Sequence, residues 1–521
     1  MSLLYEVLPS PGSLRRRLIT EPRRPAWVRA SPRAHWYVVG TVCIGAFMGQ
    51  LDASIVTLAL PRLGRDLHAT VGAVEWVALT YLLVLVASVA TVGRIADAVG
   101  RKLLYVYGFG VFTAGSVLCG LAPTLVVLLA ARALQAVGAA MLQANSVALI
   151  TEAMPRPLLG RGIGVQGAAQ ALGLALGPAV GGALLALGGW RLIFLVNLPA
   201  GAIGLALGWF LLPRSRSRTA TNGGDWSAAV LLALGVAGPL MYLSLGGRAG
   251  YGDPLLLLAL AAGLVAAAGF VRRELRVDAP LIDLSIFRRP ALSVGLSSGL
   301  VSYLVLFGAL FVVPYYLAAR HVDAALVGLQ LSVLPVALGI AAPIAGRLLN
   351  RVGEGLLTGG GLILAALGLV EIALRHSTPG LLAGLAVAGL GLGAFTPANN
   401  ATIMSASPVG HTGVVGGVLN MTRGIGTALG VALGSALYTA AAGLSGGTAA
   451  HATATSAADG LTTALGVLGV IALATGVALL LRRGAGRGRE RDDVTRSRGP
   501  TRAHRSTLSG HPRDVDMHAR P

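Results

Sequence analysis

Charged residues are scarce in this chain. Of its 521 residues, only 12% are Asp, Glu, Lys or Arg, while 55% are hydrophobic, and the mean hydropathy is +0.74. A soluble domain carries about 25% charged residues. The shortage of charge argues against an ordinary water-soluble protein and points to a membrane.

Cysteine and lysine are also nearly absent. The two cysteines, Cys43 and Cys119, lie inside apolar blocks, so neither a disulfide framework nor a cysteine metal site is expected. A GxxxxGK[ST] phosphate loop is missing from the sequence, which argues against direct ATP drive. The nine histidines are scattered and form no catalytic constellation. We therefore expect that the protein is not an enzyme and that it binds no metal or cofactor. We expect a proton gradient to be its energy source.

What the chain does have is long apolar blocks. About 20 helical residues cross the ~30 Å hydrocarbon core, and a segment in lipid must satisfy its backbone hydrogen bonds internally, so these blocks are predicted to be helices. The first block begins near Tyr37 without a small-residue cleavage site, which indicates a retained helix. The predicted spans are 37–60, 74–93, 103–122, 124–150, 162–187, 191–212, 226–246, 254–271, 292–318, 326–348, 356–374, 380–405, 413–442 and 460–481.

The basic residues are distributed unevenly about these spans. The net charge of +20 is compatible with nucleic-acid binding, but 33 basic residues fall in the two tails and alternate loops, against 6 in the other loops. This asymmetry is the positive-inside pattern of a membrane protein. It predicts that both termini are cytoplasmic, that the lipid bilayer and not nucleic acid is the partner, and that the protein is multi-pass in the cell inner (plasma) membrane.

Two segments of the chain echo one another. Residues 93–100 read GRIADAVG and residues 346–353 read GRLLNRVG, each after the second span of a six-span set. Glycine also recurs at every fourth residue in the fifth and thirteenth spans. Duplicated halves are typical of secondary transporters. The expected divisions are an N-terminal tail (1–36), a first six-helix half (37–212), two inserted helices (226–271), a second six-helix half (292–481) and a disordered C-terminal tail (482–521).

The segment from Gly93 to Lys102 is a candidate conformational gate. Gly93 and Gly100 permit a tight turn between helices. Asp97 and Arg101 lie one helical turn apart and can pair with each other or with a neighbouring helix end. Such a cluster could lock one conformation. The alternative is a plain cytoplasmic turn with the usual positive charge.

Asp52 is the candidate proton carrier. It lies well inside the first span, at greater depth than any other carboxylate in the sequence. A carboxylate at mid-membrane costs roughly 2.5–3.5 kcal/mol on insertion scales, and such burial favours its neutral form. A group poised in this way can take up a proton on one side and release it on the other. The alternative is a structural hydrogen bond to a neighbouring helix.

Arg132 is the second candidate for proton coupling. An Arg inside the membrane needs a carboxylate or a backbone carbonyl as partner. If it approaches Asp52, protonation of Asp52 would release it, which gives a two-state element biased by one proton. Gln135 lies on the same helix face. The alternative is that Arg132 serves only to anchor the fold.

Further polar and small residues lie at membrane depth. Gly177, Pro178 and Gly181 mark the fifth span as a tightly packed and kinked helix. Glu75 and Glu371, near external span ends, are expected to be interfacial, and Arg423 lies close enough to the cytoplasmic end for its side chain to snorkel. The candidate cavity residues are Gln50, Gln135, Gln143, Asn145, Asn399 and Asn420; each alone could equally be a hydrogen bond between helices.

Several motifs carry a family resemblance. The segment 93–102 resembles the cytoplasmic signature between helices two and three of the major facilitator superfamily. Residues 51–61 (LDASIVTLALP) resemble the first-helix motif of its fourteen-helix drug:proton antiporter branch. Similar likenesses occur at 132–140, 173–182, 189–201 and 420–426. Ala136 departs from the glycine usual in the fourth-helix motif, so close packing there is in doubt.

The resemblance implies an all-α polytopic fold with two six-helix halves and two inserted central helices. It also implies a monomeric proton-coupled antiporter that exports small hydrophobic or amphipathic drugs or antibiotics, with an acid at Asp52. The 173–182 motif would set antiport over symport. A proton-coupled importer of a small metabolite is the alternative. The tenth span lacks the carboxylate that some polycation exporters of this branch carry, which argues against dicationic substrates.

Overall fold

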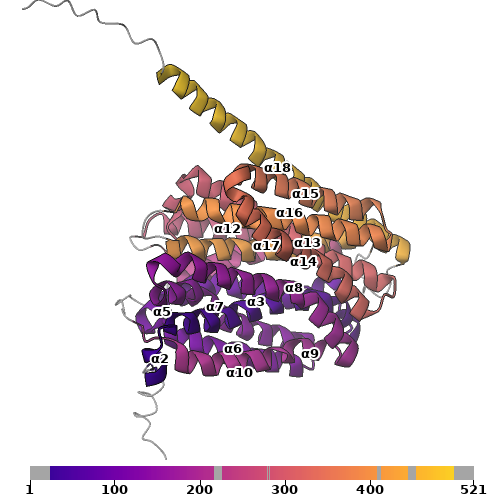
Figure 1. Ribbon diagram of the computed structural model, residues 1–521. Coiled ribbons are helices and arrows are strands. Elements are labelled where there is room, and N and C mark those ends of the chain that lie inside the picture. Colours follow the sequence, from indigo (N-terminus) through magenta and orange to yellow (C-terminus); the bar gives the residue numbers. More distant parts are fainter. Residues whose placement is uncertain are drawn as a thin grey trace, which may run out of the picture.

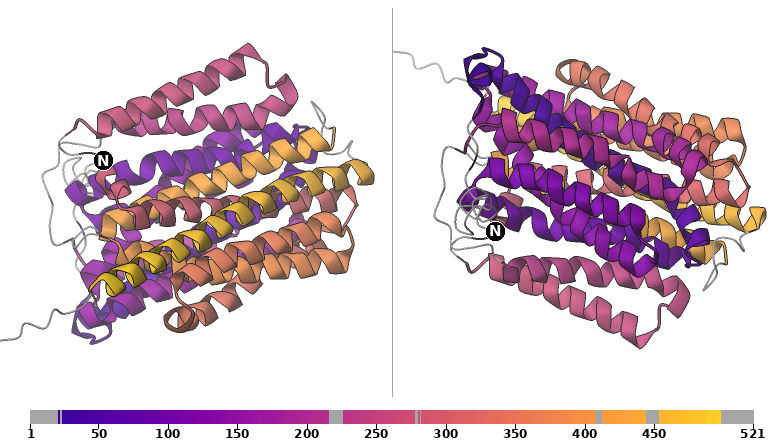
Figure 2. Two further views of the ribbon diagram at one scale, coloured as in Figure 1. Left: turned by 90° about the horizontal axis from the view of Figure 1, so that it is seen from above. Right: turned by 90° about the horizontal axis from the view of Figure 1, so that it is seen from below.

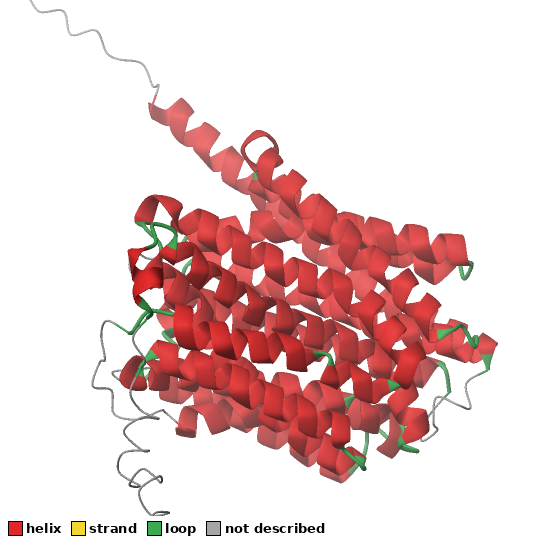
Figure 3. Cartoon of the chain, turned by 60° about the horizontal axis from the view of Figure 1, so that its bottom comes forward, coloured by secondary structure: helices red, strands yellow, loops and turns green. Residues whose placement is uncertain are grey.

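The computed structural model is built from helices. It describes residue 21 and residues 24–215, 226–277, 280, 282–407, 412–443 and 453–497, and these residues form no β-strand (Figure 3). Fourteen helices within these ranges are long and apolar enough to cross a membrane. They correspond one to one with the predicted spans. The outermost parts of both predicted tails, residues 1–20 and 498–521, lie outside the described residues.

The first half of the bundle contains six spans, two of them interrupted. Its helices are α2 (Ala26–Ala30), α3 (Ala34–Asp66), α4 (Val71–Val74), α5 (Trp76–Val99), α6 (Arg101–Leu121), α7 (Leu125–Ala153), α8 (Leu159–Gly188), α9 (Trp190–Leu195) and α10 (Asn197–Leu211). In Figure 1 this half lies below the second half, in indigo to magenta.

The second half contains the last six spans, drawn from rose through orange to yellow in Figure 1. Its helices are α13 (Pro290–Ala319), α14 (Ala324–Val352), α15 (Glu354–Leu374), α16 (Thr378–Ser405), α17 (Thr412–Ala441) and α18 (Ala454–Ser497). Two short 3₁₀ helices, η1 (Arg156–Leu158) and η2 (Leu284–Arg288), precede α8 and α13.

The pair α11 (Trp226–Ala249) and α12 (Pro254–Glu274) lies outside both halves. Figure 2 shows the two helices side by side along one flank of the bundle. The first of them packs on α5 of the first half and α17 of the second, and α12 packs on α11. Because α12 is mostly exposed and apolar, its outer face suits lipid. The pair therefore packs along the seam between the halves.

The repeated sequence segments form the same turn in both halves. Gly100 separates α5 from α6 with φ 124°, and Gly353 separates α14 from α15 with φ 87°. Residues with a side chain rarely adopt such φ values, which explains why glycine is found at both positions. Gly93, by contrast, lies inside α5. The prediction that it helps to form the turn was wrong, because the helix continues to Val99 and ends only at Gly100.

The two glycine stripes also play the same packing role. A side chain at Gly173 or Gly177 would strike Phe47 or Ser54 of α3, and one at Gly430 would strike Leu304 of α13. The fifth helix of each half thus lies directly against the first helix of that half. Small residues permit this close approach between helices in a membrane.

The helices depart from the predicted boundaries in two informative places. The sixth span breaks at Val196, where α9 ends and α10 begins. The last helix continues to Ser497, so residues 482–497 of the predicted disordered tail have helical backbone. Arg and Glu are good helix formers once a helix has been started, so it can outlast the apolar sequence.

Candidate functional site

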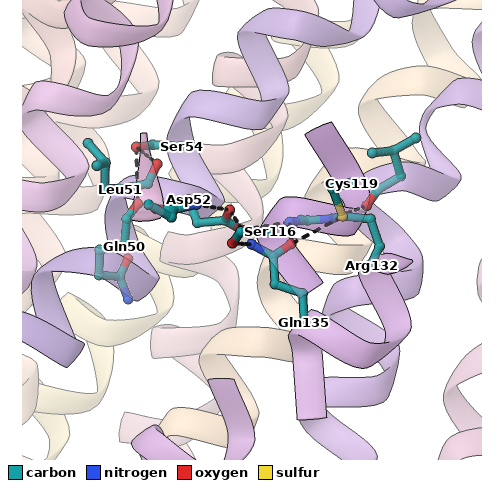
Figure 4. Close-up of polar contacts among 10 residues, drawn as sticks. Gln50, Leu51, Asp52, Ser54, Ser116, Cys119, Arg132 and Gln135 are labelled. Carbon is teal, nitrogen blue, oxygen red and sulfur yellow. Dashed lines mark hydrogen bonds and ion pairs between the residues drawn. The ribbon is translucent and has the colours of Figure 1, made fainter. Parts of the chain in front are cut away.

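Asp52 and Arg132 form a buried ion pair in the first half. Arg132 Nη1 donates to Asp52 Oδ2 at 2.7 Å, and the two side chains are 1% and 0% exposed, respectively. The Arg132 Nε also donates to the Val77 carbonyl at 2.9 Å. Arg132 thus has both kinds of partner that its depth in the membrane demanded. Figure 4 shows the two side chains reaching toward each other from α3 and α7.

Gln135 ties this pair into a network. Its Oε1 accepts from Arg132 Nη1 at 2.7 Å, while its Nε2 donates to Asp52 Oδ1 at 2.9 Å and to Ser116 Oγ at 2.8 Å (Figure 4). Gln135 is fully buried, so its predicted place in the substrate cavity was wrong. The physical reason is its position three residues after Arg132, which turns it to the same helix face and toward Asp52.

Asn197 is a partner of Asp52 that the sequence analysis missed. Its Nδ2 donates to Asp52 Oδ1 at 3.1 Å, and the side chain is only 1% exposed. As the first residue of α10, it follows the break at Val196. The sequence did contain a signal for this residue, because Asn197 is a single amide side chain between two apolar segments. Its Oδ1 finds no hydrogen-bond partner among the described residues.

Tyr81 contacts both the ion pair and the interior cavity. Its ring centroid lies 4.2 Å from the Arg132 guanidinium carbon, a cation–π contact, and Phe194 lies on Arg132 at 5.7 Å. Tyr81 also lines the cavity between the halves, whereas Asp52 does not. The Tyr81 ring is thus shared between the ion pair and the wall of the cavity.

This arrangement can respond to one proton. As a carboxylate, Asp52 accepts hydrogen bonds from three donors and neutralises the Arg132 charge. When Asp52 is protonated, Arg132 becomes an uncompensated buried cation, which costs about 3–5 kcal/mol. The charge balance of this buried site therefore depends on whether Asp52 carries a proton.

A central cavity lies between the two halves in two adjoining compartments of about 70 and 100 Å³. Both compartments are lined by Gln50, Gln170, Tyr303 and Arg423. A vestibule of about 900 Å³ continues from it toward the loops that the charge bias assigns to the cytoplasm. Gln143 and Asn420 line both the vestibule and the central cavity.

The predicted cavity residues fall into three groups. Gln50, Gln143 and Asn420 line the central cavity. Asn145 borders the vestibule, but its Nδ2 donates to the Met141 carbonyl of its own helix at 2.8 Å. The placement of Asn399 was wrong: its Nδ2 donates to the Gly295 carbonyl at 3.0 Å and its Oδ1 accepts from Ser298. Asn399 thus joins α16 to α13, because α13 packs closely on that face.

Arg423 also differs from its expectation. Its side chain does not snorkel to the cytoplasmic interface but lines both compartments of the central cavity. The Nη2 donates to Asn400 Oδ1 at 2.8 Å, and Nη1 donates to Asn420 Oδ1 at 3.3 Å. These amides hold the guanidinium inward, which the position of Arg423 along the chain could not reveal.

Three of the candidate gate residues line the vestibule. Gly93, Asp97 and Arg101 all border it. Arg101 Nη2 lies 2.8 Å from Asp97 Oδ1, one helical turn away, and Arg101 Nη1 forms an ion pair with Glu152 of α7. The predicted pairing is therefore present. It joins the α5–α6 turn to the end of α7, and its role in gating stays a prediction.

The opposite end of the bundle is closed where α8 meets α14. A side chain at Gly328 would strike the Pro178 carbonyl, and one at Gly182 would come within 2.7 Å of the Ala324 carbonyl. Gly181 faces Ile55 of α3 on the neighbouring side of α8. The kinked segment predicted around Pro178 thus contributes to the contact between the halves at the closed end.

Glu75 lies near this closed end and corrects another expectation. Predicted as interfacial, it is fully buried at the junction of α4 and α5. Ser244 of α11 and Ser435 of α17 are among the polar groups beside it, yet neither carboxylate oxygen completes a hydrogen bond with the described residues. The burial arises because helices from three parts of the chain converge there. Glu371 is partly exposed, in keeping with the expected interfacial position, and forms an ion pair with Arg375 at 3.2 Å.

Several known proteins are similar to this chain in sequence or in fold. The family model described as Major Facilitator Superfamily matches residues 42–431 and 295–512. The riboflavin transporter RibZ of Clostridioides difficile is 32% identical over 398 residues, which covers 76% of this chain and 86% of that protein. The multidrug resistance protein Stp of Mycobacterium tuberculosis is 32% identical over 391 residues, covering 74% of this chain and 72% of Stp.

Two further likenesses extend the comparison. The tetracenomycin C resistance and export protein of Streptomyces glaucescens is 30% identical over 400 residues, covering 76% of this chain and 74% of that protein. Among solved structures, a bacterial homologue of the human lysosomal transporter Spinster, inward-facing and unoccupied, has a TM-score of 0.64. It is 17% identical and covers 87% of this chain and 97% of its own, which shows a shared fold.

Proposed function

The chain belongs to the Major Facilitator Superfamily, and we propose that it is a proton-coupled antiporter that exports small hydrophobic or amphipathic drugs or antibiotics. It is a multi-pass membrane transporter. Its relatives include drug-resistance proteins, in agreement with the drug-efflux branch. We place it in the cell inner (plasma) membrane, working as a monomer with protons, substrate and lipid as its partners.

The observation that carries the proposal is the Asp52–Arg132 pair. A charge pair held at 2.7 Å and out of contact with water is costly to build and is weak evidence for stability. Ionisable residues inside a membrane mark proton relays and transport pathways. Tyr81 contacts Arg132 of this pair and also lines the cavity that would hold the substrate. The binding of a proton at Asp52 and the binding of substrate in the cavity could therefore each affect which conformation the protein adopts.

Alternating access supplies the mechanism. The structure has a vestibule at one end and the α8–α14 contact at the other, an inward-facing arrangement. Protonation of Asp52 from outside would weaken its hold on Arg132 and favour return to this state. Loss of the proton to the cytoplasm would restore the pair while substrate binds in the central cavity. Two related halves that rock about a central site are the usual plan of such transporters.

The driving force sets a limit on accumulation. Each net charge that moves inward supplies about 2.3 kcal/mol per 100 mV of membrane potential. At 1.4 kcal/mol per tenfold, this supports a concentration ratio of roughly 40-fold. If a monovalent cation is exchanged for one proton, the exchange is electroneutral and only the pH gradient contributes.

Everted membrane vesicles with an acidified lumen test the proposal. Added substrate should release protons from vesicles that contain the wild-type protein, and Asp52→Asn should abolish this release. Asp52→Glu, which keeps an acid, should retain part of it, and Asp66→Asn, in the exposed pair with Arg62, should retain all of it. Substrate-induced proton release that survives Asp52→Asn with an unchanged pH dependence would rule out the coupling scheme.

Import of a small metabolite is the second candidate. It is favoured by the relative named as a riboflavin transporter, whose identity equals that of Stp. The two functions predict opposite changes in intact cells. Deletion of the gene raises cell-associated substrate if the protein exports it and lowers it if the protein imports it.

A further inference from the structure

Arg423 is the one charged side chain among the described residues that line the central cavity. It borders both compartments, whose remaining lining consists of apolar residues, Ser, Thr, Tyr and the amides of Gln and Asn. The Asp52–Arg132 pair does not line either compartment. The electrostatic character of the cavity therefore depends on Arg423.

The charge of Arg423 is not neutralised by the described part of the chain. Its two hydrogen bonds go to the amide oxygens of Asn400 and Asn420, and no described carboxylate lies within ion-pair distance. An Arg guanidinium is always charged. An intramembrane Arg without a counter-ion is costly and marks a substrate or ion pathway. Arg132, which has Asp52, provides the contrast within the same protein.

The surroundings of Arg423 suit a flat aromatic molecule. The Tyr303 ring lies 5.4 Å from the Arg423 guanidinium, and Tyr303 stacks on Phe307 at 6.1 Å with 19° between the ring planes. Both rings line the cavity. The side-chain amides of Gln50 and Gln170 face the same space, so hydrogen-bond donors stand beside the positive charge and the aromatic surface.

The geometry points to a small aromatic anion as the substrate. Its carboxylate or acidic phenolate would accept charge-assisted hydrogen bonds from the Arg423 fork, while its ring would pack beside Tyr303 and Phe307. This inference rests on the proposed export function and names its substrate class. A cation of the same shape would meet Arg423 as a like charge, and no described carboxylate in the cavity would offset the repulsion.

An anionic substrate changes the electrical balance of transport. When a monoanion leaves the cell and one proton enters, both movements carry positive charge inward. Two elementary charges then cross per cycle, so the membrane potential drives export directly. A monocation exchanged for one proton moves no net charge. The dependence of transport on potential therefore reports the charge of the substrate independently of binding.

A matched pair of dyes tests the recognition. Fluorescein and rhodamine 123 share a xanthene ring system but are anionic and cationic, respectively. We expect the purified full-length protein in detergent to bind fluorescein about tenfold or more tightly than rhodamine 123, as measured by fluorescence anisotropy. Arg423→Gln should remove the preference and Arg423→Lys should keep part of it. Arg375→Gln should bind like wild type, because Arg375 is exposed and paired with Glu371 outside the cavity.

The outcomes separate this inference from the proposed function. Equal binding of both dyes, or a preference for fluorescein that survives Arg423→Gln, overturns the anion site; Arg423→Lys keeps the test valid if the Gln variant does not fold. In proteoliposomes, transport of rhodamine 123 driven by a pH gradient and unaffected by potential would also overturn it, yet would leave proton-coupled export standing. Fluorescein binding that depends on Arg423, without transport of either dye, would support the site and count against export.

Discussion

Arg132 Nη1 lies 2.7 Å from Asp52 Oδ2, and the contact joins residues 80 positions apart in a solvent-free interior. Gln135 bonds to both members of the pair. The three side chains form one unit, so the removal of any one leaves a charge or a polar atom of the others without its partner. The stability of the first half should therefore depend on this unit in a strongly non-additive way.

A double-mutant cycle on the pair tests this dependence. Asp52→Asn or Arg132→Gln alone should lower the free energy of unfolding by about 3–5 kcal/mol, since each leaves an uncompensated buried charge. The double variant should lose clearly less than the sum. Unfolding by SDS in mixed micelles gives the measurement. Arg62→Gln, which breaks an exposed pair with Asp66, should cost under about 1 kcal/mol; additive losses at Asp52 and Arg132 would contradict the coupling.

The glycine stripe of α8 offers a comparison within one helix. Gly173→Ala would place a methyl group against the Phe47 carbonyl and 3.1 Å from the Leu51 amide nitrogen, both backbone atoms of α3. It should destabilise the protein by about 1–3 kcal/mol through overpacking. Gly164→Ala, in open space on the same helix, should be neutral or stabilise by up to about 1 kcal/mol. The same SDS titration compares them, and equal effects would refute the packing role of Gly173.

Tyr81 should keep water away from the ion pair. Tyr81→Ala removes the ring that covers Arg132 and should admit water from the cavity, so that protons leak through the protein without substrate. Tyr81→Phe keeps the ring and should preserve coupling. The loss of a desolvated cation–π contact should also cost about 2 kcal/mol of stability. The effect is measured as the rate of proton leak into proteoliposomes, followed with a pH-sensitive dye. A Tyr81→Ala variant that leaks no faster than the wild type would argue against Tyr81 as a barrier to water.

Glu75 should respond to substitution in the opposite way to Asp52. Its carboxylate is buried without a completed hydrogen bond, so burying its charge is unfavourable. Glu75→Gln keeps the shape and removes the charge. The variant should be as stable as the wild type or more stable by about 1–3 kcal/mol. Thermal unfolding in detergent checks the sign, and a large loss of stability would show that Glu75 has a charged partner.

Much of the fold could be read from the sequence because the bilayer imposes it. Uninterrupted apolar blocks must be helices, and the repeated glycines at 100 and 353 mark equivalent turns in the two halves. The exact helix ends could not be read, because a helix continues into water wherever its residues permit. Gly93 and the residues after 481 show this limit.

The part of the candidate site that could be predicted is the part that follows from the depth of a charged residue in the membrane. Asp52 and Arg132 stand out as charges within apolar spans, and their need for partners follows from the cost of burial. Which amide faces which carboxylate depends on helix rotation and packing. For that reason Gln135 was assigned to the cavity, Asn197 was overlooked and Arg423 was placed at the interface, although each bears the expected kind of side chain.

The contact between Gly182 and Gly328 has a consequence for the cell that hosts this protein. Two helix backbones meet there with no side chain of their own between them, so this contact does not depend on an ion pair that salt could screen. A transporter closed by such a contact should keep that contact equally well at low and at high ionic strength.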